Sequence, residues 1–205
     1  MGIMLIAFYY ASSKLTHYKK EIKSKLEEFE SQRNSIQVFC NSIWILLCAL
    51  IDSFTNYNLQ TSIGCLCILA CCCGDTWASE LGTVWASKPR LITTFKVVPP
   101  GTNGGISVGG SFASLLGGMF IGLNYYILSI YFNELHLLSF FSAIAIGSAA
   151  GFIGSMIDSL MGATIQVSLY CKKRKLIVKK PSVDTVVVSG LPFMNNEMVS
   201  VIHSL

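Results

Sequence analysis

The stretch ISVGGSFASLLGGMFIGLNYYILSIYF, residues 106–132, decides the fold because it contains no charged side chain. A helix of this length spans about 40 Å and is long enough to cross a hydrocarbon core of about 30 Å. A second stretch, residues 137–170, likewise contains no Lys or Arg. Neither stretch shows the polar–apolar alternation of a β-strand, so both are expected to be membrane-spanning helices.

The composition of the whole chain agrees with a membrane protein. Of its 205 residues, 52% are hydrophobic and 13% are charged, and the mean hydropathy is +0.57. Soluble domains carry about 25% charged residues. This chain therefore has too little polar surface for a soluble globule, and disordered, collagen-like and disulfide-rich secreted proteins are excluded as well.

Two further segments are candidates for spans, residues 36–53 and residues 59–85. We expect an all-α, polytopic bundle of about four full spans, which forms a single transmembrane domain over residues 1–205. Residues 3–11 form an additional short apolar segment that is too brief to cross the bilayer and has no signal-peptide character. This segment is interpreted as the remnant of a span in a shortened chain.

The fifteen Lys and Arg residues fall into three clusters, within residues 14–33, 88–96 and 172–180. Two predicted spans separate each cluster from the next, so all three clusters lie on the same side of the membrane. The positive-inside rule makes that side cytoplasmic. Basic residues confined to loops do not form the continuous basic face of a nucleic-acid-binding protein, and no nucleic-acid partner is expected.

Three segments are predicted to lie on the cytoplasmic side. Residues 14–33 have apolar positions at three- and four-residue spacing, which is typical of an amphipathic helix. It is expected to lie on the membrane surface or on neighbouring helices, or else to be a solvated connector with one packed face. Residues 86–104 form a loop rich in Gly and Pro. Residues 171–205 form a basic tail, whose part 182–205 is either a re-entrant or a surface element.

The eight cysteines are interpreted mainly as small hydrophobic residues. Seven of them lie in apolar runs, and no His lies near enough in sequence to complete a zinc motif. S-acylation at residues 71–73 or at Cys171 is the alternative.

Three acidic residues lie within or at the end of the predicted spans: Asp75, Glu80 and Asp158. Ionisable residues are costly in a membrane and are therefore functional candidates. Counting helical rise from the opposite surface places Asp75 at about 24 Å and Asp158 at about 32 Å, near the cytoplasmic boundary. Asp75 and Glu80 are about 140° apart on a helix, so binding one ion together would require a kink, for instance at Gly74. The structural alternative is helix packing through the neighbouring glycines, with the acids reaching the interface.

The loop PPGTNGG, residues 99–105, follows three basic residues and precedes a hydrophobic helix. A glycine-rich turn before a helix exposes backbone N–H groups that bind phosphate well. It is not a Walker A loop, because no Gly-Lys-Ser/Thr follows. The alternative is a simple loop followed by a helix that packs through GxxxG motifs.

Three runs carry a specific resemblance: GDTWASELG at 74–82, PRLITTFKVVPPGTNGGIS at 89–107 and GSMIDSLMGATIQ at 154–166. The chain resembles the integral-membrane family of transmembrane protein 19, which includes the plant phytyl-phosphate kinase and archaeal relatives. The similarity extends over nearly the whole chain. The hydrophobic segments that usually precede Ser13 in that family are not present here.

The resemblance implies a prenyl-phosphate kinase that transfers phosphate from a nucleoside triphosphate to a membrane-held isoprenoid monophosphate. We expect Asp75 and Asp158 to hold Mg²⁺, with Glu80 as a third ligand or a support. The remaining expected site residues are a phosphate cradle of Gly101, Thr102, Asn103, Gly104 and Gly105, two neutralising cations, Arg90 and Lys96, and two acceptor-orienting residues, Gln37 and Asn41.

Two other functions are compatible with the sequence. Glycine-interrupted spans with intramembrane acids are also typical of transporters, which place those acids near the bilayer midplane. The estimated depth near one face favours the enzyme. The third possibility is a non-catalytic membrane protein, in which the glycines only pack helices.

Overall fold

Two of the long helices begin at serines that cap them. Ser107 precedes α4, Val108–Tyr131, and its Oγ accepts a hydrogen bond from the backbone N–H of Gly110 at 3.1 Å. Ser139 does the same for α5, Phe140–Thr164, where its Oγ accepts from the N–H of Ser142 at 3.2 Å. Each cap satisfies a first-turn donor that has no partner within the helix.

The computed structural model describes residues 2–23, 59–85, 88–132, 138–173, 176–178 and 184–190, with single positions at 47, 50, 51 and 54. Its other helices are α1, Gly2–Lys23, and α3, Leu59–Trp85. The strands are β1, Arg90–Leu91; β2, Gly105–Ile106; β3, Ser168–Cys171; β4, Leu176–Val178; and β5, Thr185–Ser189.

Three helices of the described chain, α3, α4 and α5, are long and apolar enough to cross a membrane. They confirm the spans predicted at residues 59–85, 106–132 and 137–170. Together with the family described below, they also confirm the polytopic helical bundle. The span predicted at 36–53 lies outside the described residues, except for helical positions at 47, 50 and 51.

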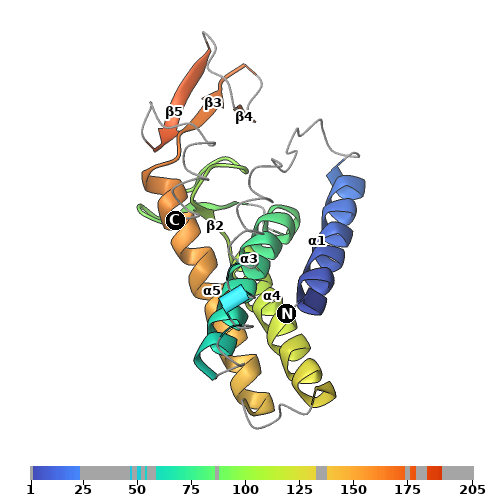
Figure 1. Ribbon diagram of the computed structural model, residues 1–205. Coiled ribbons are helices and arrows are strands. Elements are labelled where there is room, and N and C mark those ends of the chain that lie inside the picture. The colour runs from blue at the N-terminus through green and yellow to red at the C-terminus, as the bar shows by residue number, and fades with distance from the viewer. Residues whose placement is uncertain are drawn as a thin grey trace.

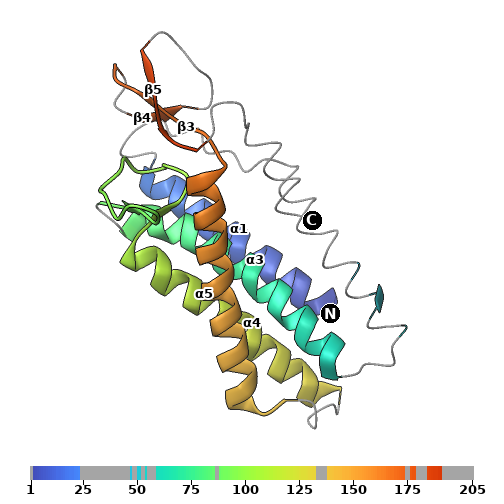
Figure 2. The ribbon, with the colours of Figure 1, turned by 90° about the vertical axis from the view of Figure 1, so that its left-hand side faces the viewer.

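Three of the helices run in one direction and α4 runs in the opposite direction, which places the described basic residues at one end. In Figures 1 and 2, α1, α3 and α5 end toward the same end of the bundle, where α4 begins. We call this the basic end, because it carries Lys19 on α1, the β1–β2 hairpin with Arg90, and the exposed Lys172 after β3. The compartment that this end faces remains a prediction.

Glycines bring the three spanning helices into backbone contact. A methyl group built on Gly74 of α3 would lie 2.6 Å from the carbonyl oxygen of Gly151 on α5. One built on Gly147 of α5 would lie 2.5 Å from the carbonyl oxygen of Gly118 on α4. Small residues allow such close approach between helices in a membrane. The helix-packing role considered for these glycines is therefore present in the structure.

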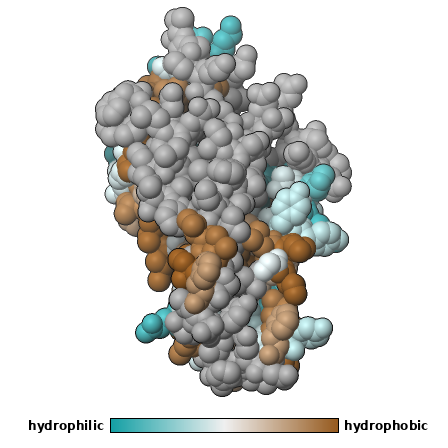
Figure 3. Space-filling model, viewed as in Figure 1, coloured by the Kyte–Doolittle hydropathy of each residue, from teal (hydrophilic) through white to brown (hydrophobic). Residues whose placement is uncertain are grey.

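The outer faces of the spans remain apolar. On α4, exposed side chains recur at three- and four-residue intervals, at Phe112, Leu115, Met119 and Leu123. Figure 3 shows exposed apolar side chains in the middle and lower part of the described surface on one side of the molecule. An apolar exterior of this kind is what lipid requires.

Two predicted helix boundaries were wrong. The last span was expected to continue to residue 170, but α5 ends at Thr164 and the chain enters β3 at Ser168. β3 is the central strand of an antiparallel sheet of order β4-β3-β5. The run of β-branched residues in β5, Thr185–Ser189, favours a strand, so part of the segment 182–205 is a sheet strand rather than a re-entrant element.

The second wrong boundary separates residues 3–11 from residues 14–33. The structure joins both in α1, which continues to Lys23. Ser12 is buried within this helix, and its carbonyl oxygen accepts a hydrogen bond from Thr16 Oγ1 at 3.1 Å. A hydroxyl that bonds back to the preceding turn is tolerated within a helix. Residues 24–33 lie outside the described residues.

Candidate functional site

Asp75 and Asp158 extend from facing helices at the same level. Cys71 of α3 donates from Sγ to the carbonyl oxygen of Ala150 on α5 at 3.1 Å, and it also contacts Gly154. Asp75 lies four residues beyond Cys71, and Asp158 lies four residues beyond Gly154. Residues four apart share a helix face, and α3 and α5 run in the same direction. Both carboxylates therefore lie one turn beyond the same contact, toward the basic end.

The glycine-rich loop approaches the same face of α5 one turn further on. A methyl group built on Gly162 would lie 2.9 Å from the backbone nitrogen of Gly104. Gly104 itself has φ 76 and contacts Ala163 so closely that a side chain would clash with its backbone. Asp158 thus lies between the contact with α3 and the contact with the loop. The structure brings together Asp75, Asp158 and the loop at residues 101–105.

Hydrogen bonds within the protein hold much of this loop. The N–H of Thr102 donates to the carbonyl oxygen of Pro99, and that of Gly105 donates to Thr102. The Thr102 hydroxyl also donates to Pro99, at 2.7 Å. These bonds form a compact turn around Gly101, which has φ 86 and is exposed. They give the loop a defined shape and use several N–H groups that an open phosphate cradle would offer.

Asn103 connects the loop to the C-terminal sheet through hydrogen bonds. Its backbone N–H donates to Ser168 Oγ at 3.0 Å, and its Nδ2 donates to the carbonyl oxygen of Val167 at 3.0 Å. Its own carbonyl oxygen accepts from Ser189 Oγ at 3.4 Å. The sequence predicted Asn103 as a phosphate ligand, whereas in the structure both of these donors serve the junction between α5, β3 and β5.

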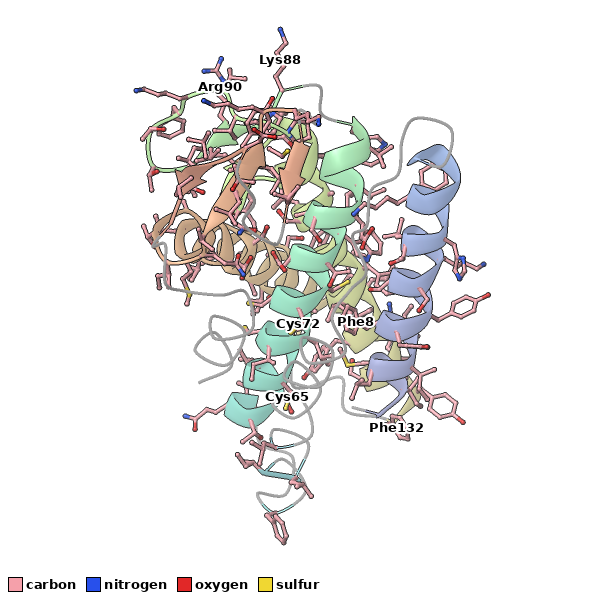
Figure 4. The ribbon with its side chains drawn as sticks, turned by 90° about the horizontal axis from the view of Figure 1, so that it is seen from above. Phe8, Cys65, Cys72, Lys88, Arg90 and Phe132 are labelled. Atoms are coloured by element: carbon pink, nitrogen blue, oxygen red, sulfur yellow. The ribbon has the colours of Figure 1, made fainter. Side chains whose placement is uncertain are left out.

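The two predicted cations lie on the part of the β1–β2 hairpin that precedes the glycine-rich loop. β1 and β2 pair antiparallel, and Arg90 and Lys96 are both exposed. Arg90 donates from Nη1 to the carbonyl oxygen of Phe95 at 3.0 Å. Figure 4, seen from above, shows Lys88 and Arg90 at the margin of the molecule beyond the end of α3. These cations give the basic end a positive rim.

Glu80 faces a different helix from the one that Asp75 approaches. Its Oε2 lies 3.1 Å from Nζ of Lys19 on α1, and the two side chains are only 9% and 12% exposed. The helix α3 runs without interruption through Gly74, which serves the contact with α5. The structure therefore gives Glu80 a cation partner on the α1 side rather than a position beside Asp75.

The donor set restricts what kind of metal could bind. Within the part of the chain that the structure describes, no three His, Cys, Asp or Glu side chains come together as a metal site. The two carboxylates of the predicted set that lie along the α3–α5 contact are Asp75 and Asp158. Mg²⁺ is usually bound through one or two carboxylates together with substrate phosphates and water, so this pair fits Mg²⁺. Gln37 and Asn41 lie outside the described residues.

Sequence reasoning missed three of these features. The Lys19–Glu80 ion pair joins residues far apart in sequence, and no local pattern announces it. The anchoring of Asn103 by Ser168 and Ser189 depends on the C-terminal sheet, which was not predicted. The β-branched residues of β5, followed by Gly190 with φ 80, were the available signal for that sheet.

Comparisons with known proteins agree with this architecture. The chain is 37% identical to Protein PGR of Arabidopsis thaliana, over 100% of this chain and 77% of that protein. It is 34% identical to the uncharacterized membrane protein MJ0933 of Methanocaldococcus jannaschii, over 80% of this chain and 64% of that protein. Protein VTE6, chloroplastic, of Arabidopsis thaliana is 28% identical over 58% of this chain and 38% of its own length. No solved structure matches the chain.

The family model described as integral membrane protein DUF92 matches residues 1–205. This match extends over the spanning helices, the hairpin, the glycine-rich loop and the C-terminal sheet alike. The chain is therefore a multi-pass membrane protein that belongs to the DUF92 integral membrane family.

Proposed function

We propose that the protein is a prenyl-phosphate kinase that acts at the basic end of the bundle. The observation that carries the proposal is the order of contacts along α5: Asp75 and Asp158 each lie one turn beyond the contact of Cys71 with Ala150 and Gly154, and the glycine-rich loop packs on α5 one turn beyond Asp158. The resemblance of the chain to a family with a plant phytyl-phosphate kinase supports the same chemistry. The substrates are a nucleoside triphosphate from the aqueous side and an isoprenoid monophosphate held by its tail in the bilayer.

The reaction requires little proton chemistry from the protein. The second pKa of a phosphate monoester is about 6, so the acceptor is largely a dianion near pH 7 and needs no strong base. One of its oxygens attacks the γ-phosphorus, a new P–O bond forms, and the bond to the β-phosphate bridging oxygen breaks to release the nucleoside diphosphate. The protein contributes positioning and neutralisation of charge.

The residues divide this work between them. Asp75 and Asp158 would hold Mg²⁺, which neutralises phosphate charge when bound. The exposed turn at Gly101 would let a phosphate approach the backbone, whereas Gly104 packs on Ala163 and holds the loop against α5. Arg90 and Lys96 add positive charge at the aqueous rim. We leave Glu80 out of the metal site, because Lys19 already neutralises it.

The site also fits the lipid substrate geometrically. The carboxylates lie within spanning helices, about two to three turns before the ends of α3 and α5, so a polar head can reach them while its tail stays in lipid. A soluble acceptor would not need a site at this depth.

The test is an assay of the purified full chain in nanodiscs with prenyl monophosphates of several lengths, Mg²⁺, and labelled CTP or ATP. Labelled prenyl diphosphate is expected from wild type, with a loss of about 100-fold or more in Asp75→Asn and in Asp158→Asn. Asp184→Asn is the matched control, because Asp184 is exposed beside β5 and its substitution should leave the rate unchanged.

Two results would overturn the proposal. One is a folded wild-type protein that forms no diphosphate with any chain length or nucleotide. The other is a carboxylate variant as active as Asp184→Asn, which would remove the metal assignment even if the activity remained.

A further inference from the structure

The β1–β2 hairpin exposes apolar side chains in the middle of a cationic segment. Phe95 is 62% exposed and Val97 is 55% exposed. Lys88, Arg90 and Lys96, all exposed, flank them in sequence. Exposed apolar side chains among basic ones are the combination that membrane-surface elements use.

The backbone holds Phe95 in this exposed position. Its φ is 55, in the left-handed region that is uncommon for a bulky residue. Its N–H donates to the carbonyl oxygen of Leu91 at 2.7 Å, and its carbonyl oxygen accepts from Arg90 Nη1 at 3.0 Å. The N–H of Leu91 donates in turn to Lys96 at 2.9 Å. These bonds maintain a strained conformation, and such strain concentrates at functional sites.

The hairpin is connected directly to the ends of the candidate spans. It joins the end of α3 at Trp85 to the start of α4 at Val108, and Gly104 at its base packs on Ala163 in the last turn of α5. Arg90 is five residues from Trp85, within about 17 Å even for an extended chain. Polar headgroup layers are about 5 to 8 Å thick on each side of the hydrocarbon core, so they lie within reach of the hairpin.

We infer that this hairpin is a membrane anchor that binds acidic phospholipids of the bilayer surface. Phe95 and Val97 enter the boundary between headgroups and acyl chains, while Lys88, Arg90 and Lys96 contact the anionic headgroups. Phe is among the apolar residues that membrane-surface elements bury at this boundary, and each basic residue near an anionic surface favours binding by about fivefold. The anchor would fix the hairpin, and through Gly104 and Asn103 the glycine-rich loop, against the bilayer.

This inference does not depend on the proposed kinase activity. Arg90 and Lys96 have a role in both, and the two roles are compatible because a prenyl phosphate would arrive in the same headgroup plane. The measurement below detects contact with lipid and not enzymatic turnover. A negative result in either experiment therefore leaves the other proposal unaffected.

The experiment places a photoreactive residue at the hairpin tip. Phe95→p-benzoylphenylalanine is made in the full chain, reconstituted in nanodiscs of phosphatidylcholine with or without phosphatidylglycerol, and irradiated. Lipid adducts are counted by mass spectrometry. Val186→p-benzoylphenylalanine is the control, because Val186 is exposed on β5 in the sheet that Figure 1 shows beyond the end of the bundle. Several-fold more lipid adduct is expected at position 95 than at 186, with phosphatidylglycerol enriched.

A pair of charge variants tests the headgroup contact. Lys88→Gln with Lys96→Gln, which keeps the Arg90–Phe95 bond, should lower the ratio of acidic to neutral lipid adducts severalfold. Lys172→Gln with Lys173→Gln removes the same charge beside β3 and should leave that ratio unchanged. If the probe at position 95 prevents folding, Val97 takes its place.

The inference is overturned if position 95 captures no more lipid than position 186, or captures protein instead. It is overturned equally if both charge variants change the lipid ratio to the same extent.

Discussion

Gly74 shows how a single hydrogen atom in place of a side chain determines the packing of α3 on α5. A Cβ at this position would lie 2.6 Å from Gly151 O and 2.7 Å from Gly151 Cα, and backbone atoms cannot move aside as a side chain can. At Gly64 of the same helix, a methyl group would meet nothing within 4 Å. The two glycines therefore differ only in the space around them: Gly74 is in close backbone contact, and Gly64 is not.

We therefore predict that Gly74→Ala destabilises the folded protein by about 1–3 kcal/mol, since overpacking a backbone contact forces the helices apart. Gly64→Ala should be neutral or slightly stabilising, because Ala is favoured over Gly in a helix by about 1 kcal/mol. Thermal unfolding of both variants in the same detergent checks the prediction. Equal melting temperatures would show that the close approach at Gly74 does not contribute to stability.

The Lys19–Glu80 pair is the second feature argued at the residue scale. Its charges lie 3.1 Å apart, with the side chains 12% and 9% exposed, so each needs the other in a region of low polarity. Removing one partner leaves a buried charge, which costs about 3 kcal/mol or more. Lys19→Met and Glu80→Gln should each lower the unfolding free energy.

A charge exchange separates the pair from its surroundings. Lys19→Glu with Glu80→Lys restores opposite charges and should recover part of the stability that either single exchange removes. A double-mutant cycle on unfolding free energies gives the coupling energy. A coupling near zero would mean that the two side chains act independently and that α1 is held on α3 by Met4 and its apolar neighbours alone.

At the scale of elements, Asn103 connects the glycine-rich loop to the last helix and the C-terminal sheet. Asn103→Ala removes the 3.0 Å bond from Nδ2 to Val167 O, which leaves a carbonyl oxygen without that donor and should weaken the α5–β3 junction by about 1–2 kcal/mol. Backbone amides of β3 should then exchange hydrogen faster, while those of α3 should not.

Asn124→Ala is the matched control for that measurement. Asn124 Nδ2 donates to Phe120 O within α4 at 2.7 Å, so its loss is local to one helix. Unchanged exchange in β3 of the Asn103 variant would show that the sheet is held to the bundle by other contacts.

The elements also show which parts of the fold could be predicted from sequence. The spans α3 and α4 were predicted to within two residues at each end, because apolar length in a membrane is decisive. The sheet was not predicted, because β3 follows an apolar helix directly and its four residues continue the same hydrophobicity. A short strand is defined by the partner it pairs with, and the partner β5 begins only at Thr185, beyond a basic segment that separates it from β3 in sequence.

The candidate site was predictable to the same extent. Counting helical rise from the predicted starts separated Asp75 and Asp158 by about 8 Å in depth, whereas the contacts of Cys71 with Ala150 and Gly154 place both one turn beyond the same point. The separation of Glu80 from Asp75 followed from helix geometry, but its pairing with Lys19 did not. That pair depends on how α1 packs against α3. This packing is part of the tertiary structure, and no short sequence pattern indicates it.

For the whole molecule, the distribution of lysines makes a prediction about orientation. The loop around residues 133–137 contains no Lys or Arg, whereas exposed Lys88, Lys96, Lys172 and Lys173 lie at the basic end. The positive-inside rule places that end in the cytoplasm. An amine-reactive reagent that cannot cross membranes should therefore label these four lysines in inverted vesicles and not in spheroplasts of a bacterial host.

Glu134→Lys supplies the missing lysine for the opposite side. It should be labelled in spheroplasts and protected in inverted vesicles, which is the reverse of the pattern expected for the native lysines. The predicted topology has an even number of membrane crossings between the basic clusters and an odd number between each cluster and residue 134. Peptide mass spectrometry assigns the labelled positions. If residue 134 and the basic end react in the same preparation, the number of crossings between them is even and the topology is wrong. If the whole pattern is inverted, the crossings are right and the basic end faces outward, away from cytosolic nucleotide, so that the kinase proposal would lose its phosphate donor.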